Sequence, residues 1–209
     1  MGGLGGLATD DGRLVIVAGA SRSGKTAWTA RQVRKLPRVL VWDAECQWAV
    51  LPGFRKVSGR RELIRAVQGA GPARLAFVPG PDLRGDFDVW SAAARYWGTY
   101  CGPCVVVAEE LADVSTPAKA PAEWGMLVRR GLKRGISIYA ISQRWAEADK
   151  TAVGNASEFV LFRMSSGDDI AYMARKTRVP AAELESLAPL QYVRFSVTGD
   201  IERGRLTFR

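Results

Sequence analysis

Eight consecutive residues near the start of the chain have the spacing of a loop that binds phosphate groups. They fit G-x-x-x-x-G-K-[ST] and are Gly19, Ala20, Ser21, Arg22, Ser23, Gly24, Lys25 and Thr26. The two glycines let the backbone turn tightly, so that its amides can approach phosphate oxygens. We expect Lys25 to reach the β- and γ-phosphates of ATP and the Thr26 hydroxyl to bind Mg²⁺. The alternative is a Gly/Ser-rich surface turn.

Two adjacent carboxylates follow an apolar run further along the chain. Residues 105–108 are Val-Val-Val-Ala, and Glu109 and Glu110 come next. One carboxylate at a strand end can hold Mg²⁺, and the next can polarise an attacking water. This is the Walker B pattern with Glu where Asp is usual. We therefore assign Glu109 to the metal and Glu110 to the water, and we predict ATP hydrolysis.

The composition excludes several other chemistries. The 209 residues include no His, which excludes His-based triads and His general bases. Three cysteines, Cys46, Cys101 and Cys104, are too few for a disulfide scaffold. The last two enclose Gly-Pro as in a thioredoxin motif, but they follow an expected helix and precede a strand, so we interpret them as a turn. A net charge of +9 favours a polyanionic partner, nucleic acid first and anionic membrane second, although an Arg-rich composition alone gives the same charge.

Short apolar runs that alternate with helical patterns must position these residues. We predict strands at residues 14–18, 39–42, 75–78, 105–108, 136–141 and 159–162. We predict helices at residues 25–36, 60–68, 87–97, 123–133, 168–176 and 181–187. Residues 192–197 and 205–208 flank Thr198-Gly199-Asp200 and indicate a C-terminal β-hairpin. This alternation is typical of an α/β fold with a mostly parallel sheet flanked by helices.

The length favours one domain. We expect residues 13–209 to form a single domain and the Gly-rich residues 1–12 to be a flexible tail. No apolar run approaches the roughly 20 residues needed to cross a bilayer. Residues 111–122, rich in Ala, Ser, Thr and Pro, are expected to form a mobile loop.

A basic stretch precedes a strand that ends in glutamine. Residues 129–134 are Arg-Arg-Gly-Leu-Lys-Arg, and Ser142 and Gln143 follow the predicted strand at 136–141. With the phosphate loop and the acidic pair, this order resembles the FtsK–HerA branch of DNA-pumping ATPases, which have a RecA-like P-loop core. Asp43 after the second strand also looks like that family. The small size looks most like the genome-packaging ATPases of membrane-containing, tectivirus-like viruses.

The resemblance implies roles for residues outside the phosphate loop. Gln143 would sense the γ-phosphate, and one arginine of the basic stretch would act on the nucleotide of a neighbouring subunit. We expect this arginine to be Arg130, with Arg129 and Arg134 as alternatives.

The resemblance also implies an assembly and a location. We expect a homo-oligomeric ring, a hexamer, that translocates double-stranded DNA into a viral capsid. Capsid vertex proteins would be further partners, and the protein would act in the host cytoplasm or at the packaging vertex of the virion.

Other functions are compatible with a phosphate loop. A P-loop kinase of a small metabolite is one, and a phage assembly or secretion ATPase of the zonula-occludens-toxin group is another. A nucleotide-dependent scaffold without catalysis is a third, which Glu110 argues against. A role in plasmid transfer or chromosome partition is also compatible with the sequence.

Overall fold

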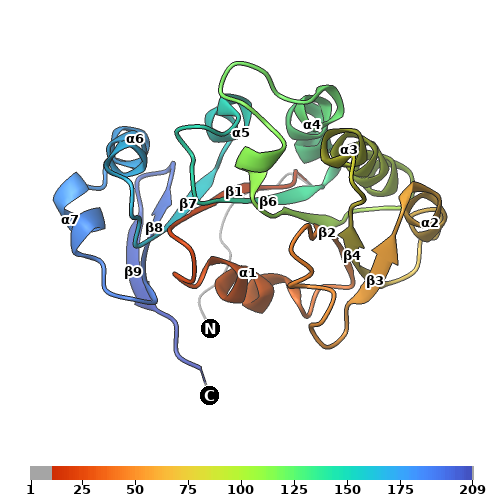
Figure 1. Ribbon diagram of the computed structural model, residues 1–209, viewed down its shortest axis with the longest axis horizontal. Coiled ribbons are helices and arrows are strands. Elements are labelled where there is room, and N and C mark those ends of the chain that lie inside the picture. Colours follow the sequence, from red (N-terminus) through yellow and green to blue (C-terminus); the bar gives the residue numbers. More distant parts are fainter. Residues whose placement is uncertain (1–10, 209) are drawn as a thin grey trace.

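A computed structural model describes residues 11–208, and within them nine strands form one sheet (Figure 1). The sheet order is β3-β4-β2-β5-β6-β1-β7-β8-β9. Its strands are β1 (Leu14–Ala18), β2 (Arg38–Trp42), β3 (Arg55–Ser58), β4 (Ala73–Val78), β5 (Val105–Ala108), β6 (Ser137–Ser142), β7 (Glu158–Phe162), β8 (Gln191–Ser196) and β9 (Ile201–Arg205). All pairs are parallel from β3 to β7, and β8 and β9 are antiparallel. The predicted α/β fold with a mostly parallel sheet and a C-terminal hairpin is confirmed.

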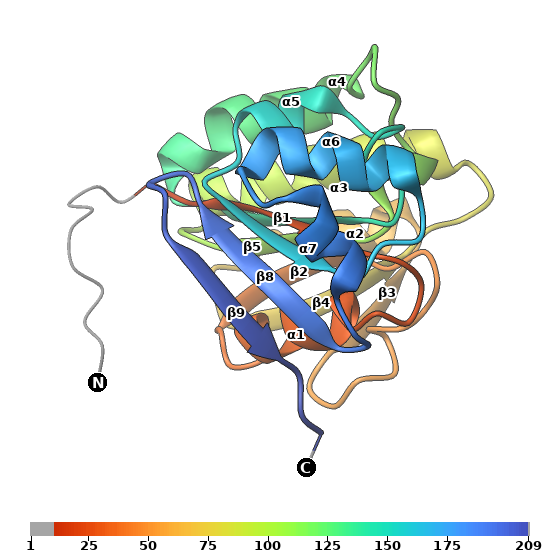
Figure 2. The same ribbon diagram turned by 90° about the vertical axis from the view of Figure 1, so that its left-hand side faces the viewer.

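The helices cover the two faces of the sheet unequally. They are α1 (Lys25–Val33), α2 (Arg60–Ala66), α3 (Leu83–Tyr100), α4 (Ala122–Met126), α5 (Lys150–Gly154), α6 (Gly167–Thr177) and α7 (Ala181–Ser186). Only α1 lies below the sheet in Figure 1, whereas α2 to α6 lie above it. Figure 2 shows α7 beside α6 and next to β8. The central strands β1 and β2 are buried along their whole length because both faces are covered, which explains their continuous apolar runs.

Several elements differ from those predicted. The strand β3 was not predicted, because only Val57 of its four residues is apolar and buried. The helix α5 was also missed; Asp149 caps it by accepting from the amides of Thr151 and Ala152. The predicted helix at 123–133 is α4 followed by a π-helical turn at Leu127–Gly131 and a 3₁₀ turn at Leu132–Arg134. The second hairpin strand lies at Ile201–Arg205 and not at 205–208, because its register is fixed by β8.

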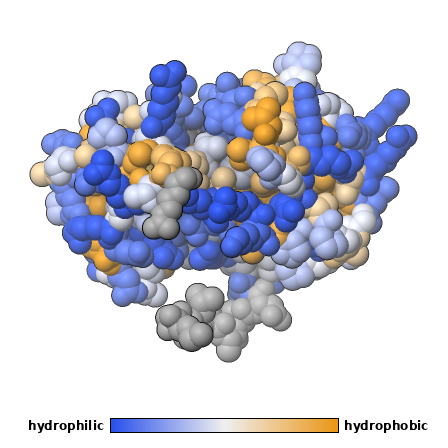
Figure 3. Space-filling model, turned by 90° about the horizontal axis from the view of Figure 1, so that it is seen from below, coloured by the Kyte–Doolittle hydropathy of each residue, from blue (hydrophilic) through white to orange (hydrophobic). Residues whose placement is uncertain are grey.

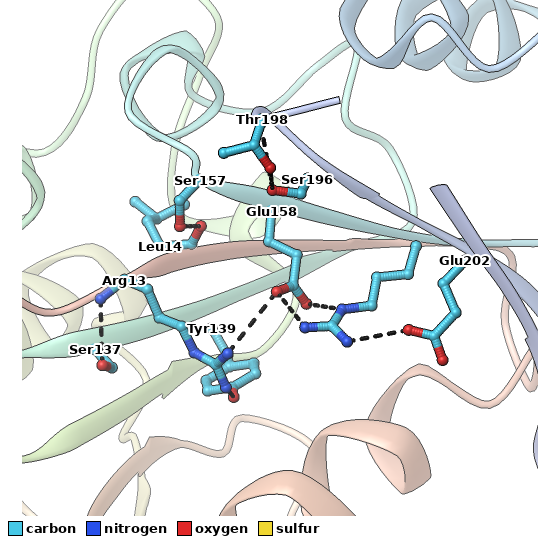
Figure 4. Close-up of polar contacts among 10 residues, drawn as sticks. Arg13, Leu14, Ser137, Tyr139, Ser157, Glu158, Ser196, Thr198 and Glu202 are labelled. Atoms are coloured by element: carbon cyan, nitrogen blue, oxygen red, sulfur yellow. Dashed lines mark hydrogen bonds and ion pairs between the residues drawn. The ribbon is translucent and has the colours of Figure 1, made fainter. Parts of the chain in front are cut away.

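An ion-pair network joins four strands at the start of β1, on the α1 side of the sheet. The Glu158 carboxylate of β7 accepts from Nε and one terminal nitrogen of Arg194 on β8, both at 2.8 Å. Arg13, just before β1, lies 3.8 Å from the same carboxylate and donates to the Tyr139 hydroxyl of β6 at 2.7 Å (Figure 4). Arg194 also contacts Glu202 of β9 at 3.2 Å. The network therefore ties the antiparallel hairpin to the parallel part of the sheet.

The chain enters the fold at Gly12, whose amide donates to the Leu132 carbonyl at 2.7 Å. The greater part of the predicted N-terminal tail, residues 1–10, lies outside the described residues. Between residues 11 and 208, no helix has the length and apolar character that crossing a membrane requires.

Candidate active site

The phosphate loop joins the end of β1 to the start of α1. The backbone of Gly24 is left-handed, with φ 112°, directly before the first residue of α1. A Cβ atom at this position would lie 2.7 Å from Leu206 Cδ1 and 3.2 Å from Phe162 Cε1. Glycine is therefore required here by both backbone conformation and space. The amide of Ala20 donates to the Arg163 carbonyl at 2.8 Å, which holds the first turn of the loop against the end of β7.

Lys25 is buried within this loop. Its ammonium group donates to the carbonyls of Gly19 and Ala20 at 2.8 and 2.9 Å. Burial lowers the pKa of Lys25, and the nearby carboxylates of Glu110 and Glu109 oppose that shift. The lysine and the two acids thus lie within electrostatic range of one another.

Glu109 comes directly after β5. Its Oε1 accepts from the indole Nε1 of Trp48 at 2.8 Å. Burial raises the pKa of Glu109, while the hydrogen bonds from Trp48 and the Thr26 hydroxyl and the charge of Lys25 act in the opposite direction. The structure therefore brings together the two residues predicted to bind the metal, Thr26 and Glu109.

Glu110 has a left-handed backbone, with φ 45° and ψ 58°. Such a conformation costs about 1–2 kcal/mol for a residue with a Cβ atom and is common at functional sites. Three donors hold its carboxylate: the Ser142 hydroxyl at 3.0 Å, and the backbone amide and Nε2 of Gln143, both at 2.9 Å. The Glu110 carboxylate thus contacts the last residue of β6 and the residue that follows it.

The strand order explains why these residues meet. β6 lies between β1, which leads into the phosphate loop, and β5, which leads into the acidic pair. All three strands are parallel, so their carboxyl ends share one edge of the sheet. Gln143 follows the central strand of the three and consequently lies between the loop and the acids.

A cavity of about 980 Å³ opens at this edge. It is lined by residues 21–26 of the phosphate loop together with Glu109, Glu110 and Gln143. Gly19 and Ala20 do not line it and contribute the carbonyls that Lys25 contacts. Other lining residues were not predicted and follow no motif: Glu45, Gln47, Asp113, Arg144, Ser165, Ser166, Asp169, Leu190 and Phe208.

The charges around the cavity are predominantly negative. Among the described residues that line it, six are carboxylates and three are cations. The cations are Arg22, Lys25 and Arg144, and the carboxylates are Asp43, Glu45, Glu109, Glu110, Asp113 and Asp169. Such a surface would repel a free polyphosphate more strongly than a polyphosphate whose charge is partly neutralised by a divalent cation. The lining therefore suits a polyphosphate that carries a divalent cation, and Thr26 and Glu109 would be the protein groups that hold this cation.

Asp43 has a structural explanation. Its carboxylate is buried and accepts from the backbone amides of Gln47, Trp48 and Ala49 at 2.7–3.0 Å. These contacts build the loop that carries Trp48 to Glu109. Asp43 therefore acts on the site through the loop that it holds.

The basic stretch lies elsewhere. Arg129, Arg130 and Arg134 are exposed, and none of them lines the cavity. The stretch leads into the start of β6, and strand starts lie at the edge of a parallel sheet opposite to the strand ends. The structure therefore does not bring these arginines together with the phosphate loop and the acidic pair of the same chain.

The cysteine pair also lies away from the cavity. Cys101 and Cys104 come between α3 and β5, at the edge where β5 begins. Burial raises the pKa of the Cys104 thiol to about 12, so at neutral pH it is not a thiolate. This environment agrees with the interpretation of the pair as a turn.

Comparisons with known proteins agree with this geometry. No family model matches the chain. It is 31% identical over 200 residues to protein P9 of Pseudoalteromonas phage PM2, a match that covers 93% of this chain and 90% of that protein. Among solved structures, it resembles the genome-packaging NTPase B204 of Sulfolobus turreted icosahedral virus 2 in complex with AMPPCP, with a TM-score of 0.77 and 11% identity over 95% of this chain and 99% of that one.

A second solved structure is the DNA-packaging ATPase B204 of Sulfolobus turreted icosahedral virus. Its TM-score is 0.73, with 13% identity over 97% of this chain and all of that one. At such identities the likeness establishes a common fold. The resemblance to viral genome-packaging ATPases inferred from the motifs is thereby confirmed for the fold.

Proposed function

Because the chain belongs to the family of protein P9 of phage PM2, we propose that it is an ATP-hydrolysing motor that translocates double-stranded DNA and packages a viral genome into a capsid. One observation carries the proposal. The phosphate loop, the acidic pair and Gln143 line one cavity at one edge of the sheet. A motor must couple ATP hydrolysis to movement, and the contact between Glu110 and Gln143 can serve that coupling. A kinase of a small metabolite does not need such a contact.

The residues of the cavity have different roles in ATP hydrolysis. The loop amides and Lys25 bind the phosphates, and Thr26 and Glu109 hold the magnesium ion of the nucleotide. Bound Mg²⁺ would neutralise charge on the phosphate oxygens. Glu110 orients the attacking water and takes up its proton, as expected of a carboxylate placed beside the metal-binding residue.

Gln143 connects the phosphate to this carboxylate. Its Nε2 donates to Glu110 Oε2 at 2.9 Å, and a side-chain amide has two N–H donors and one oxygen acceptor. Contact with a γ-phosphate would therefore compete with, or add to, its bond to Glu110. In this way the presence of the γ-phosphate can set the orientation of the residue that activates water.

The proposed assembly is a ring of identical subunits, a hexamer, around a DNA duplex. The chain carries a net charge of +9, which favours sequence-independent binding to the phosphates of the DNA backbone. Arg130 would add a further cation to Lys25 at the γ-phosphate, by acting on the neighbour's cavity. As a motor of the FtsK–HerA type, the protein would work in the host cytoplasm or at the packaging vertex of the virion. Capsid vertex proteins would be its further partners.

The test is ATPase activity with and without linear duplex DNA, measured beside particle size by light scattering. We expect DNA to stimulate hydrolysis and particles to have the size of a ring. DNA binding should be independent of sequence and weaken steeply between low and physiological salt. Stimulation by a small metabolite and not by DNA would overturn the proposal, as would a DNA affinity that does not change with salt.

A further inference from the structure

Two apolar residues that the phosphate chemistry does not use line the cavity. Leu190 and Phe208 line it together with the phosphate loop, and both come from the C-terminal part of the chain. Figure 2 shows β9 ending beside α1, with the C-terminal tail continuing from there. The surface on this side of the molecule is largely hydrophilic, with apolar residues gathered in patches (Figure 3).

The tail is fixed to the phosphate loop by Leu206. This residue is buried, and its amide donates to the Leu190 carbonyl at 2.9 Å. Leu206 Cδ1 and Leu190 Cδ2 would lie 2.7 and 3.3 Å from a Cβ atom on Gly24. Both leucines therefore pack directly on the last glycine of the loop.

The tail is also fixed to α1. The guanidinium of Arg31 donates to the Thr207 carbonyl and lies 5.3 Å from the centre of the Phe208 ring. The Phe208 side chain nevertheless remains 63% exposed. An aromatic ring that is held in place but contributes little to the core has most of its surface available for a ligand.

Leu190 is held in a strained conformation. Its φ is +66°, in the left-handed region, which costs about 1–2 kcal/mol for a residue with a Cβ atom. Two hydrogen bonds between Ala188 and Gln191, one from each residue's amide, close the turn around it. Strain of this kind is maintained where surrounding contacts determine the conformation, often at ligand sites.

We propose that Leu190 and Phe208 bind the base of the nucleotide, with the base stacked on the Phe208 ring. This inference rests on the proposed function, because the same cavity must bind the phosphates through residues 21–26. It adds a base site that no motif identifies, formed by the turn before β8 and the C-terminal tail. Stacking does not read the edge of a base, so ATP and GTP should both use it.

Calorimetric titration with magnesium-ATP, magnesium-GTP and magnesium-tripolyphosphate tests the inference. Phe208→Ala should weaken ATP and GTP binding by roughly 5- to 150-fold, the range that loss of one base–aromatic stack gives, and should leave tripolyphosphate binding unchanged. Phe208→Trp should restore ATP affinity. Tyr100→Ala, which removes an exposed aromatic ring outside the cavity, is the matched control and should change none of the affinities.

Two results would overturn the base site. One is an ATP affinity of Phe208→Ala equal to that of the unmodified chain; the other is an equal loss for ATP and tripolyphosphate. In both cases the proposed function stands if the unmodified chain binds and hydrolyses ATP. If that chain binds neither ATP nor tripolyphosphate, the proposed function itself fails.

Discussion

Lys25 is buried, and its two hydrogen bonds to the loop place its ammonium group beside the cavity. We expect Lys25→Ala to lose nearly all ATP hydrolysis, at least about 100-fold, because no other ammonium group lines the described part of the cavity. Circular dichroism should remain native-like. Lys35→Ala, which removes an exposed lysine just after α1, should keep full activity. Wild-type turnover of Lys25→Ala would refute the assignment.

Glu110 is held by three donors, and a glutamine at this position can still accept from Ser142 and from the Gln143 amide. We therefore expect Glu110→Gln to bind ATP normally and to hydrolyse it about 100-fold or more slowly, because the charge that activates water is removed. Single-turnover hydrolysis measured beside ATP binding separates the two effects. Loss of binding with an unchanged rate constant for the bound nucleotide would contradict this role.

Glu109 is a buried acid whose pKa is raised by burial. Its charge therefore destabilises the fold above that raised pKa, and the penalty decreases as the pH falls through it. Glu109→Gln keeps an acceptor for Trp48 and should raise the Tm of the nucleotide-free protein at pH 8, because it removes the buried charge.

The gain in Tm should be smaller at pH 5, as thermal unfolding at both pH values would show. The same variant should weaken the Mg²⁺ dependence of hydrolysis. Loss of hydrolysis with intact metal affinity would mean that Glu109 and Glu110 have exchanged roles.

Among single residues, the sequence identifies the site residues that belong to a motif and misses those that do not. The phosphate loop and the acidic pair could be named because each follows an apolar strand, and Gln143 was named from the family resemblance. The bond between Gln143 and Glu110 could not be predicted, because it depends on the strand order. Leu190 and Phe208 line the cavity, and Trp48 contacts Glu109, because of segments whose course no local pattern determines.

At the level of secondary-structure elements, the ion pair Glu158–Arg194 joins β7 to β8 on the α1 face of the sheet. Glu158→Gln removes the carboxylate that Arg13 and Arg194 share and leaves Arg194 only its more exposed partner Glu202. We expect the free energy of unfolding to fall by about 2 kcal/mol, the contribution of hydrogen bonds to charged groups. For a chain of this size the Tm should decrease by roughly 4–8 °C.

The matched control is Glu202→Gln, which removes the other and more exposed partner of Arg194. It should lower the Tm by less than half as much, because exposed ion pairs contribute little. Equal effects of the two substitutions in thermal unfolding would show that the burial of Glu158 has no energetic importance.

The elements that were predicted correctly and those that were missed differ in where their stability comes from. The central strands have continuous apolar sequences because both faces are buried. β3 is an edge strand with the sequence Arg-Lys-Val-Ser, and it exists because β4 provides backbone partners. The irregular turns at Leu127–Gly131 and Leu132–Arg134 interrupt a helical pattern that propensity alone would continue.

For the whole molecule, the distance of Arg130 from its own cavity makes the proposed ring testable. Lys25→Ala subunits and Arg130→Ala subunits should each be inactive alone. Mixed together, some interfaces would pair an intact loop with an intact arginine, so partial ATPase activity should return. Native mass spectrometry would establish that mixed oligomers form.

An inactive mixture that contains mixed oligomers would rule out Arg130 as the arginine acting between subunits. Repeating the mixture with Arg129→Ala and with Arg134→Ala would identify an alternative. If Arg130→Ala alone keeps full ATPase activity and loses DNA affinity, the basic stretch belongs to the DNA-binding surface.

The bond between Trp48 and Glu109 also gives the molecule an optical property. The indole of Trp48 is fully buried, and its N–H donates to the carboxylate that we propose holds the metal. When a cation neutralises that carboxylate, the electric field across the indole changes, and so does the energy of its excited state. The emission of Trp48 should therefore report arrival of the metal-bound nucleotide without an attached dye, and Trp48→Phe would give the background from the other six tryptophans.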